Sequence, residues 1–156
     1  MKRAAERTQG VRDKTRIVAR LSMNHFLRTL NLIAGLQGGD LLLSQVFLSI
    51  AVGNVDHIDR AGDGGDFEGL ERAPPDALRR PVSVLNISRS LGLPYETTRR
   101  QVGRLLASGD VVRVSRGLIV PTRVIDKAEI KEALRINMSN LRQLLRRLEE
   151  VGVSLQ

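Results

Sequence analysis

The residues best suited to chemistry lie together in the second half of the chain, where Thr97 and Thr98 precede Arg99 and Arg100. A third arginine, Arg104, follows about one helical turn after Arg100. A guanidinium group binds phosphate or guanine through paired hydrogen bonds, and a threonine hydroxyl reaches base edges or the phosphate backbone. These residue types at this spacing predict recognition of an anionic polymer rather than catalysis.

A helix over residues 94–108 separates this segment into two faces, because successive side chains turn by about 100°. The side toward the core carries Thr98, Val102, Leu105 and Leu106. The outer side carries Glu96, Thr97, Arg100, Gly103, Arg104 and Ala107, with Tyr95 and Arg99 at its edge. Gly103 lowers helix stability by about 1 kcal/mol relative to alanine, and packing does not offset that loss on an exposed face. Close approach of another molecule explains the glycine, so the sequence favours a helix that lies in a DNA groove.

Catalytic and metal-binding patterns do not occur in the sequence. The chain has two histidines and no cysteine, which excludes disulfides, thiolate metal sites and thiol nucleophiles. It contains no Ser-His-Asp or HExxH arrangement and no GxxxxGK[ST] or GxGxxG string. The carboxylates and histidine of Asp56–Asp59 match no zinc or calcium spacing. We therefore expect no enzyme activity, no metal and no cofactor.

The charge of the chain agrees with an anionic partner. The formal net charge is +8, and the calculated pI is near 11.1. Residues 81–125 carry seven arginines, no lysine and two acidic side chains. Arginine in place of lysine favours paired contacts to phosphate or guanine. With 42% hydrophobic and 3% aromatic residues in a chain of 156, we expect one globular domain with an aliphatic core.

The N-terminal part of the chain predicts two helices after a polar start. Residues 1–12 are interpreted as a flexible basic arm without a secretory signal, and residues 13–58 as an N-terminal helical dimerisation region. The first helix of this region ends at Gln37–Asp40, where Asp40 caps a second helix that is apolar nearly all round. Its most apolar run, Leu41–Val52, is too short to span a bilayer. We expect this helix to be buried in the domain core or in a subunit interface, and the protein to be soluble and cytoplasmic.

Two further segments flank the basic helix and its neighbours. Residues 59–80 contain four glycines, two adjacent prolines and an acidic excess, and predict a loop with little to bury. Residues 126–156 predict a C-terminal dimerisation helix with an apolar stripe at steps of four and three. The stripe consists of Ile130, Leu134, Met138, Leu141, Leu145 and Leu148.

Residues 81–125 predict a compact DNA-binding unit. Ser83 caps a short helix that stops at Gly92, and a three-residue connection leads into the basic helix. Two β-prone segments around Ser115-Arg116-Gly117 then predict a tight hairpin, with Arg113 and Arg116 at and near its tip. A helix, a tight turn, a basic helix and a basic hairpin in this order are the parts of a winged helix-turn-helix.

The segment from Ile87 to Pro121 resembles the DNA-binding part of bacterial winged-helix transcription regulators. Leu91-Gly92, then Thr97-x-Arg99-Arg100, then Gly109 before a strand follow the pattern of the GntR type. Apolar helices on both sides of the winged unit resemble the dimeric MarR type, although the loop at 59–80 is not part of that pattern. The resemblance covers residues 81–121. It implies recognition-helix positions for Tyr95, Glu96, Thr97, Arg99 and Arg100, and wing positions for Arg113 and Arg116.

Two residues depart from the pattern of these regulators. Pro94 stands where a capping serine is usual, which removes one phosphate-binding hydroxyl. Thr98 replaces the usual buried valine and places a hydroxyl near the core, where we expect it to bond back to a backbone carbonyl.

We therefore expect a mainly α protein, a winged helix-turn-helix with a short β-hairpin wing and flanking N- and C-terminal dimerisation helices. Its expected function is sequence-specific regulation of transcription, as a homodimeric repressor on an inverted repeat in double-stranded DNA. Thr97 and Arg100 read bases, and Glu96 accepts a hydrogen bond from cytosine. The phosphate contacts come from Arg99, Arg104, Arg113 and Arg116. The expected dimer interface consists of Leu41, Phe47, Ile130, Leu134, Met138, Leu141, Leu145 and Leu148.

Two alternatives remain open from the sequence. One is a winged-helix adaptor whose basic face binds an acidic protein, and the other is a nucleoid-associated protein that binds DNA without sequence preference. The sequence predicts no membrane partner, and it identifies neither the operator nor any small-molecule effector.

Overall fold

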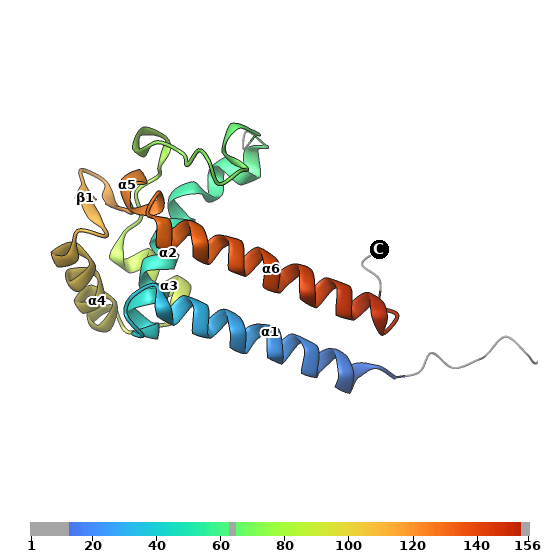
Figure 1. Ribbon diagram of the computed structural model, residues 1–156. Coiled ribbons are helices and arrows are strands. Elements are labelled where there is room, and N and C mark those ends of the chain that lie inside the picture. Colours follow the sequence, from blue (N-terminus) through green and yellow to red (C-terminus); the bar gives the residue numbers. More distant parts are fainter. Residues whose placement is uncertain (1–12, 63–64, 154–156) are drawn as a thin grey trace, which may run out of the picture.

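The computed structural model describes residues 13–62 and 65–153 (Figure 1). The predicted arm at 1–12 lies outside the described residues. The main elements are α1 (Thr15–Gly35), α2 (Leu41–Ala61), α3 (Val84–Leu91), α4 (Tyr95–Ser108), β1 (Val112–Val114), β2 (Gly117–Ile119), α5 (Thr122–Ile125) and α6 (Ala128–Glu150). Two 3-10 turns, η1 (Gly65–Phe67) and η2 (Asp76–Leu78), lie between α2 and α3. The prediction of a mainly helical chain with a short β-hairpin is confirmed.

Helix α2 is the centre of the fold, because it packs against α1, α3, α4 and β2. Its side chains Val46, Phe47 and Ile50 are at most 1% exposed. The buried cluster around it also contains Leu43, Ile87, Val102, Leu105, Val111, Leu118, Val120, Val124 and Ile130. Apart from Phe47, every member of this cluster is aliphatic, as the composition predicts.

Helix α2 also has the length and composition of a membrane-spanning segment. Within the described ranges, Leu41–Arg60 is the one stretch that meets this criterion, by length and hydropathy alone. The prediction that this segment is too short to span a bilayer concerned only the apolar run to Val52, whereas the helix continues to Ala61. The central helix of a folded domain meets the same criterion, and in this structure α2 fills the core of the domain.

The predicted helix ends are confirmed at several positions. The Asp40 carboxylate accepts a hydrogen bond from the Leu43 amide at 2.9 Å and caps α2. The Ser83 hydroxyl accepts the amide three residues further on at 3.1 Å and caps α3. Gly92 and Gly109 end α3 and α4 in the left-handed conformation, with φ of 64° and 78°. The helices of the predicted DNA-binding unit therefore begin and end where the sequence indicates.

The segment between α2 and α3 is anchored to the domain, which differs from the predicted loop at 59–80 with little to bury. The Arg79 side chain is only 2% exposed and donates a hydrogen bond to the carbonyl of Pro74 at 3.0 Å. The Asp76 carboxylate accepts hydrogen bonds from the amide and the hydroxyl of Thr122, at 2.6 and 2.8 Å, at the start of α5. These contacts hold residues 74–79 against the hairpin side of the fold.

The β-hairpin has a third backbone partner in the chain before α3. Strands β1 and β2 pair antiparallel with Val114 opposite Gly117. Val82 then exchanges two backbone hydrogen bonds with Leu118, at 3.1 and 2.9 Å. A Cβ on Gly117 would lie 2.6 Å from the Val82 carbonyl oxygen, and the φ of Gly117 is 146°. Only glycine fits this position.

Asn54 connects α2 to the hairpin and is fully buried. Its Nδ2 donates to the carbonyls of Arg80 and Leu118 at 2.7 and 3.1 Å, and its Oδ1 accepts the Val120 amide at 2.9 Å. Each of these backbone groups lies far from Asn54 in sequence, so the sequence analysis did not single it out. The polar residue inside an apolar helix was the available signal.

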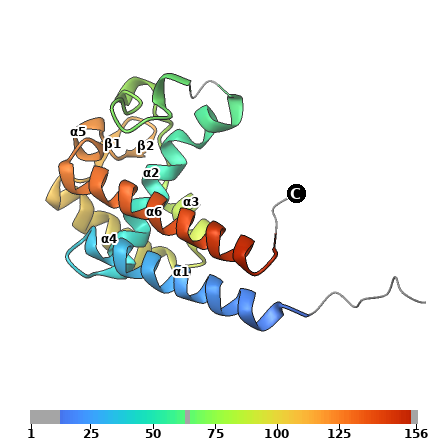
Figure 2. The same cartoon turned by 45° about the vertical axis from the view of Figure 1, so that its right-hand side comes forward.

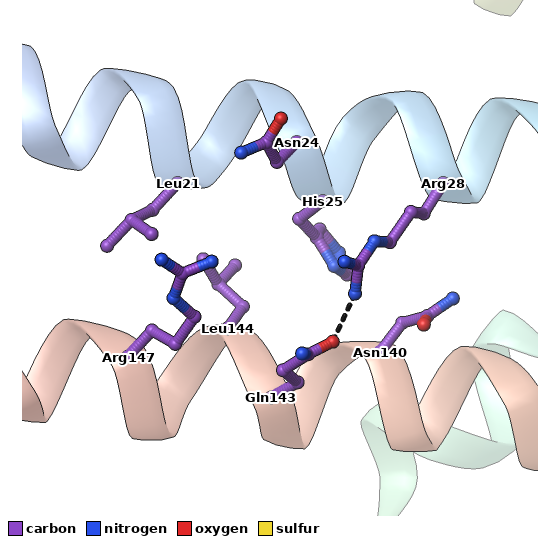
Figure 3. A pocket seen from close by; sticks show the side chains of 8 residues that line it. All are labelled: Leu21, Asn24, His25, Arg28, Asn140, Gln143, Leu144 and Arg147. Atoms are coloured by element: carbon purple, nitrogen blue, oxygen red, sulfur yellow. Dashed lines mark hydrogen bonds between the residues drawn. The ribbon is translucent and has the colours of Figure 1, made fainter.

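Helices α1 and α6 lie side by side and project from the rest of the molecule (Figures 1 and 2). They run antiparallel, since Lys14 before α1 donates to the carbonyl of Gly152 after α6 at 3.2 Å. Figure 3 shows that many side chains between their outer halves are polar, and that Arg28 of α1 bonds to Gln143 of α6. The residues drawn there are Leu21, Asn24, His25, Arg28, Asn140, Gln143, Leu144 and Arg147.

Candidate nucleic-acid interface

The connection between α3 and α4 is fixed by reciprocal hydrogen bonds. The Ser88 hydroxyl donates to the Leu93 carbonyl at 2.7 Å, and the Leu93 amide donates to the Ser88 carbonyl at 3.0 Å. Gly92 supplies the left-handed residue that the turn requires. Ser88 is buried and was not singled out from the sequence. The angle between the two helices is thus set by a defined turn and not by a flexible linker.

The inner face of α4 agrees with the predicted sorting of residues 94–108. Thr98, Val102 and Leu105 are at most 2% exposed. The Thr98 hydroxyl donates to the Pro94 carbonyl at 3.2 Å, which confirms the predicted bond back to the backbone. Gln101 is also buried, at 6% exposed, although the sequence did not place it on this face.

The outer face of α4 is open to solvent at most of the predicted positions. Tyr95, Glu96, Arg99 and Arg100 are exposed, and Thr97 is half-buried. A Cβ built on Gly103 would meet no atom within 4 Å. No neighbour inside the protein therefore requires a glycine at this position. Its backbone conformation does not require one either, because its φ lies outside the left-handed region.

The arginines of this surface differ in their partners. Arg99 pairs with Glu96 at 2.9 Å one turn away, and both side chains are more than 60% exposed. Such a pair contributes little to stability and exchanges readily for another partner. Within residues 13–62 and 65–153, no carboxylate lies within 4 Å of the guanidinium groups of Arg100, Arg113 and Arg116. Their charges are available to an external anion.

Arg104 is placed differently from the sequence expectation of a free phosphate contact. Its Nη1 donates to the Asp40 carboxylate at 2.6 Å and to the Gln101 side-chain carbonyl at 2.8 Å. Asp40 is brought there by its capping position at the start of α2, which packs against α4. The Asp40 cap is predictable from the local sequence, but its proximity to α4 is not, because Asp40 and Arg104 lie 64 positions apart.

The hairpin presents its arginines next to α4. Arg116 lies in the two-residue turn between β1 and β2, Arg113 lies on β1, and both are exposed. Figure 1 shows α4 and the hairpin together at one end of the molecule, away from the free ends of α1 and α6. The predicted recognition-helix and wing residues are thus brought to the same end of the fold.

Two charged residues of the same region have structural partners instead. Arg123 donates to the carbonyl of Gly109 at 3.0 Å and so closes the C-terminal end of α4. Asp110 pairs with Lys127 at 2.9 Å. Burial raises the pKa of Asp110, but hydrogen bonds from Lys127 and Ser108 outweigh it and hold the pKa below its ordinary value. Together these contacts fix the end of α4 to α5 and the start of α6.

The expected dimer-interface residues fall into two groups. Leu134, Met138 and Leu141 are 47, 48 and 38% exposed on α6, and Leu41, Leu145 and Leu148 are half-buried. Phe47 and Ile130 lie in the protomer's own core, because α2 packs inside the domain and α6 begins against it. They differ from the other predicted interface residues in being at most 9% exposed, although both also contribute to the lining of an apolar groove between α1, α2 and α6.

An apolar groove of about 340 Å³ lies where α1, α2 and α6 meet. Ile33, Val52 and Leu134 are among the side chains that line it, one from each helix. Met23, Phe26 and Leu27 of α1 are more than 50% exposed further along the projecting helices. Large apolar side chains thus remain uncovered by this protomer, at the groove and along the two helices.

Comparisons with known proteins supply no relative for this chain. No family model, curated protein or solved structure matches it. Among the described residues, no group of three or more histidine and carboxylate side chains is arranged to hold a metal ion. The candidate interface therefore rests on its geometry: an exposed arginine-bearing helix, an exposed arginine-bearing hairpin and a defined turn behind them.

Proposed function

We propose that this protein is a homodimeric winged helix-turn-helix regulator that binds a specific sequence in duplex DNA and represses transcription. In this assignment α3 and α4 form the helix-turn-helix, α4 is the recognition helix and the β1–β2 hairpin is the wing. Thr97 and Arg100 contact base edges, and Glu96 accepts a hydrogen bond from cytosine. Arg99, Arg113 and Arg116 bind phosphates.

The observation that carries the proposal is the outer face of α4. It combines exposed Arg99 and Arg100 with Gly103, whose missing side chain leaves open space. A glycine in a helix interior lowers stability, and nothing within the described protein requires one there. A major groove accommodates an α-helix whose surface allows close approach, and its base edges accept hydrogen bonds from arginine.

The homodimer is supported by the projecting helices. Phe26 and Ile33 of α1 and Leu134, Met138 and Leu141 of α6 leave apolar surface uncovered, whereas many residues between the two helices are polar. A helix pair with this distribution is typical of one half of a larger bundle. A second copy that packs its own α1 and α6 here forms a closed two-fold dimer and presents two recognition helices.

The DNA-binding assignment is tested by titrating the protein against fluorescent duplex DNA at several salt concentrations. Arg100→Ala should weaken binding to a selected site by about 1–3 kcal/mol, because it removes a base contact. Arg60→Ala is the matched control, since Arg60 is 79% exposed at the far end of α2. Arg116→Ala should weaken all sequences alike and flatten the salt dependence. An Arg99→Ala/Arg100→Ala double variant with wild-type affinity would refute the assignment.

The dimer is tested by the molar mass in solution. Leu141→Glu places a charge on the apolar face of α6 and should convert the dimer to a monomer. Arg142→Glu, at the neighbouring exposed position, is the matched control and should remain dimeric. Light scattering with size-exclusion chromatography measures both. A wild-type monomer, or a dimer that Leu141→Glu leaves intact, would contradict this part of the proposal.

A further inference from the structure

The ion pair between Asp40 and Arg104 joins two parts of the molecule with separate proposed roles. Asp40 lies in the turn between α1, a proposed dimer helix, and α2. Arg104 lies on α4, one turn after Arg100 and on the same outer side. The two side chains meet at 2.6 Å, and their exposed fractions are 34% for Asp40 and 50% for Arg104. An exposed arginine on the outer side of α4 is thus held by a carboxylate from another element.

The partners of this pair are themselves held in place. One carboxylate oxygen of Asp40 accepts the Leu43 amide at 2.9 Å, while the other accepts from Arg104. Gln101, which is buried, accepts from the same Arg104 nitrogen at 2.8 Å. The hydrogen bond from the Leu43 amide and then that from Arg104 lower the pKa of Asp40, so the carboxylate stays charged at neutral pH. The guanidinium therefore meets a fixed, charged acceptor rather than a mobile one.

We propose that Asp40 is a positioning residue that holds Arg104 away from DNA and so limits the number of phosphates that α4 neutralises. The inference rests on the proposed DNA-binding function. With the pair intact, Arg104 satisfies its charge inside the protein and ties α4 to the turn between α1 and α2. When Asp40 loses its charge, Arg104 is free to bind one additional phosphate.

Asp40→Asn removes the ion pair with Arg104 but keeps the helix cap. Asparagine caps a helix as well as aspartate does, so the Leu43 amide keeps its acceptor. We expect this variant to bind duplex DNA about two- to fivefold more tightly, because Arg104 no longer has to give up a half-exposed ion pair, whose free energy corresponds to a factor of about that size. The plot of log affinity against log salt should steepen by about 0.9, as expected for one more phosphate contact. Asp40→Ser, which also retains a capping oxygen, is the second variant and should give the same change.

Arg104→Ala distinguishes release of this arginine from a general effect of removing negative charge. Alone, Arg104→Ala should leave the affinity and the salt slope close to wild type, whereas Arg100→Ala weakens binding. In the Arg104→Ala background, Asp40→Asn should have almost no effect. Thermal unfolding followed by circular dichroism confirms that each variant is folded before its affinity is measured.

Four outcomes would overturn the inference. An equal gain from Asp40→Asn with and without Arg104 would assign the effect to general electrostatics. A loss from Arg104→Ala as large as that from Arg100→Ala would place Arg104 on DNA with Asp40 unchanged. If wild type binds and Asp40→Asn changes nothing, this inference fails alone, whereas no binding by wild type or any variant rejects the proposed function as well.

Discussion

Gly103 offers a prediction in which stability and function move in opposite directions. It is the ninth residue of the 14-residue helix α4, so it lies in the helix interior. Its backbone is not in the left-handed region, and a Cβ there would meet no atom within 4 Å. Gly103→Ala therefore removes the conformational cost of glycine without creating a clash. The free energy of unfolding should rise by about 0.8–1 kcal/mol, the difference in helix propensity between the two residues.

The same substitution should weaken binding to duplex DNA. If α4 lies in the major groove, a side chain at position 103 is directed to the outer surface and holds the helix further from the bases. Gly103→Leu extends the series, because leucine has a helix propensity close to that of alanine but a much larger side chain. Affinity should fall from glycine to alanine to leucine, while both variants stay at least as stable as wild type.

Urea denaturation gives the stability of each variant, and fluorescence anisotropy with a selected duplex gives its affinity. Ala107→Gly, one turn further along the same face, is the reverse control and should lower stability by about 1 kcal/mol. A series in which stability rises and affinity stays constant would refute the argument that Gly103 serves close approach to DNA.

Three further predictions concern the framework behind α4. Asn54→Ala should lower the free energy of unfolding by about 2–4 kcal/mol, because it leaves the buried Val120 amide without a partner, and hydrogen exchange at that amide should become fast. The exposed Asn86 serves as the matched alanine control in the same denaturation experiment. Gly117→Ala should cost about 2 kcal/mol or more, because its Cβ would lie 2.6 Å from a backbone oxygen, and a melting temperature equal to wild type would contradict this. Burial raises the pKa of Asp76, but hydrogen bonds from Thr122 bring it below the ordinary 3.8. The stability that Asp76 adds is therefore present above about pH 4 and lost as the pH falls, so the difference from Asp76→Asn should narrow in acid unfolding curves.

Local signals predicted most of the elements correctly. The caps at Asp40 and Ser83 and the left-handed glycines at 92 and 109 are confirmed because each is set by residues within one helical turn. The buried position of Thr98 follows from the same kind of signal, since helical periodicity sorts α4 into faces.

Contacts between distant parts of the chain could not be predicted in this way. Asn54 bonds to Val120, just after β2 and 66 residues later, and Arg104 meets a carboxylate 64 residues earlier. Arg79 is buried within a segment whose composition indicates a loop. In each case a polar side chain bonds to a residue that comes close only when the chain folds. The periodicity of the sequence carries no information about such a distant partner.

The dimer residues illustrate the same limit. Periodicity identified the apolar stripe of α6 but did not divide it between the protomer's own core, where Ile130 lies, and the exposed face that holds Leu134, Met138 and Leu141. That division depends on where α1 and α2 pack, which is a tertiary property. The exposed face supplies the α6 residues that the proposed interface uses.

Sequence-specific binding by a two-fold dimer is tested by selecting bound sequences from a random pool of duplex DNA. Wild type should enrich one inverted repeat whose half-sites lie about one helical turn, 10 bp, apart, because a two-fold dimer presents two copies of α4. The Arg99→Ala/Arg100→Ala variant should enrich no such sequence. A pool that wild type leaves unenriched, or an identical motif recovered with the double variant, would show that α4 does not read a specific DNA sequence.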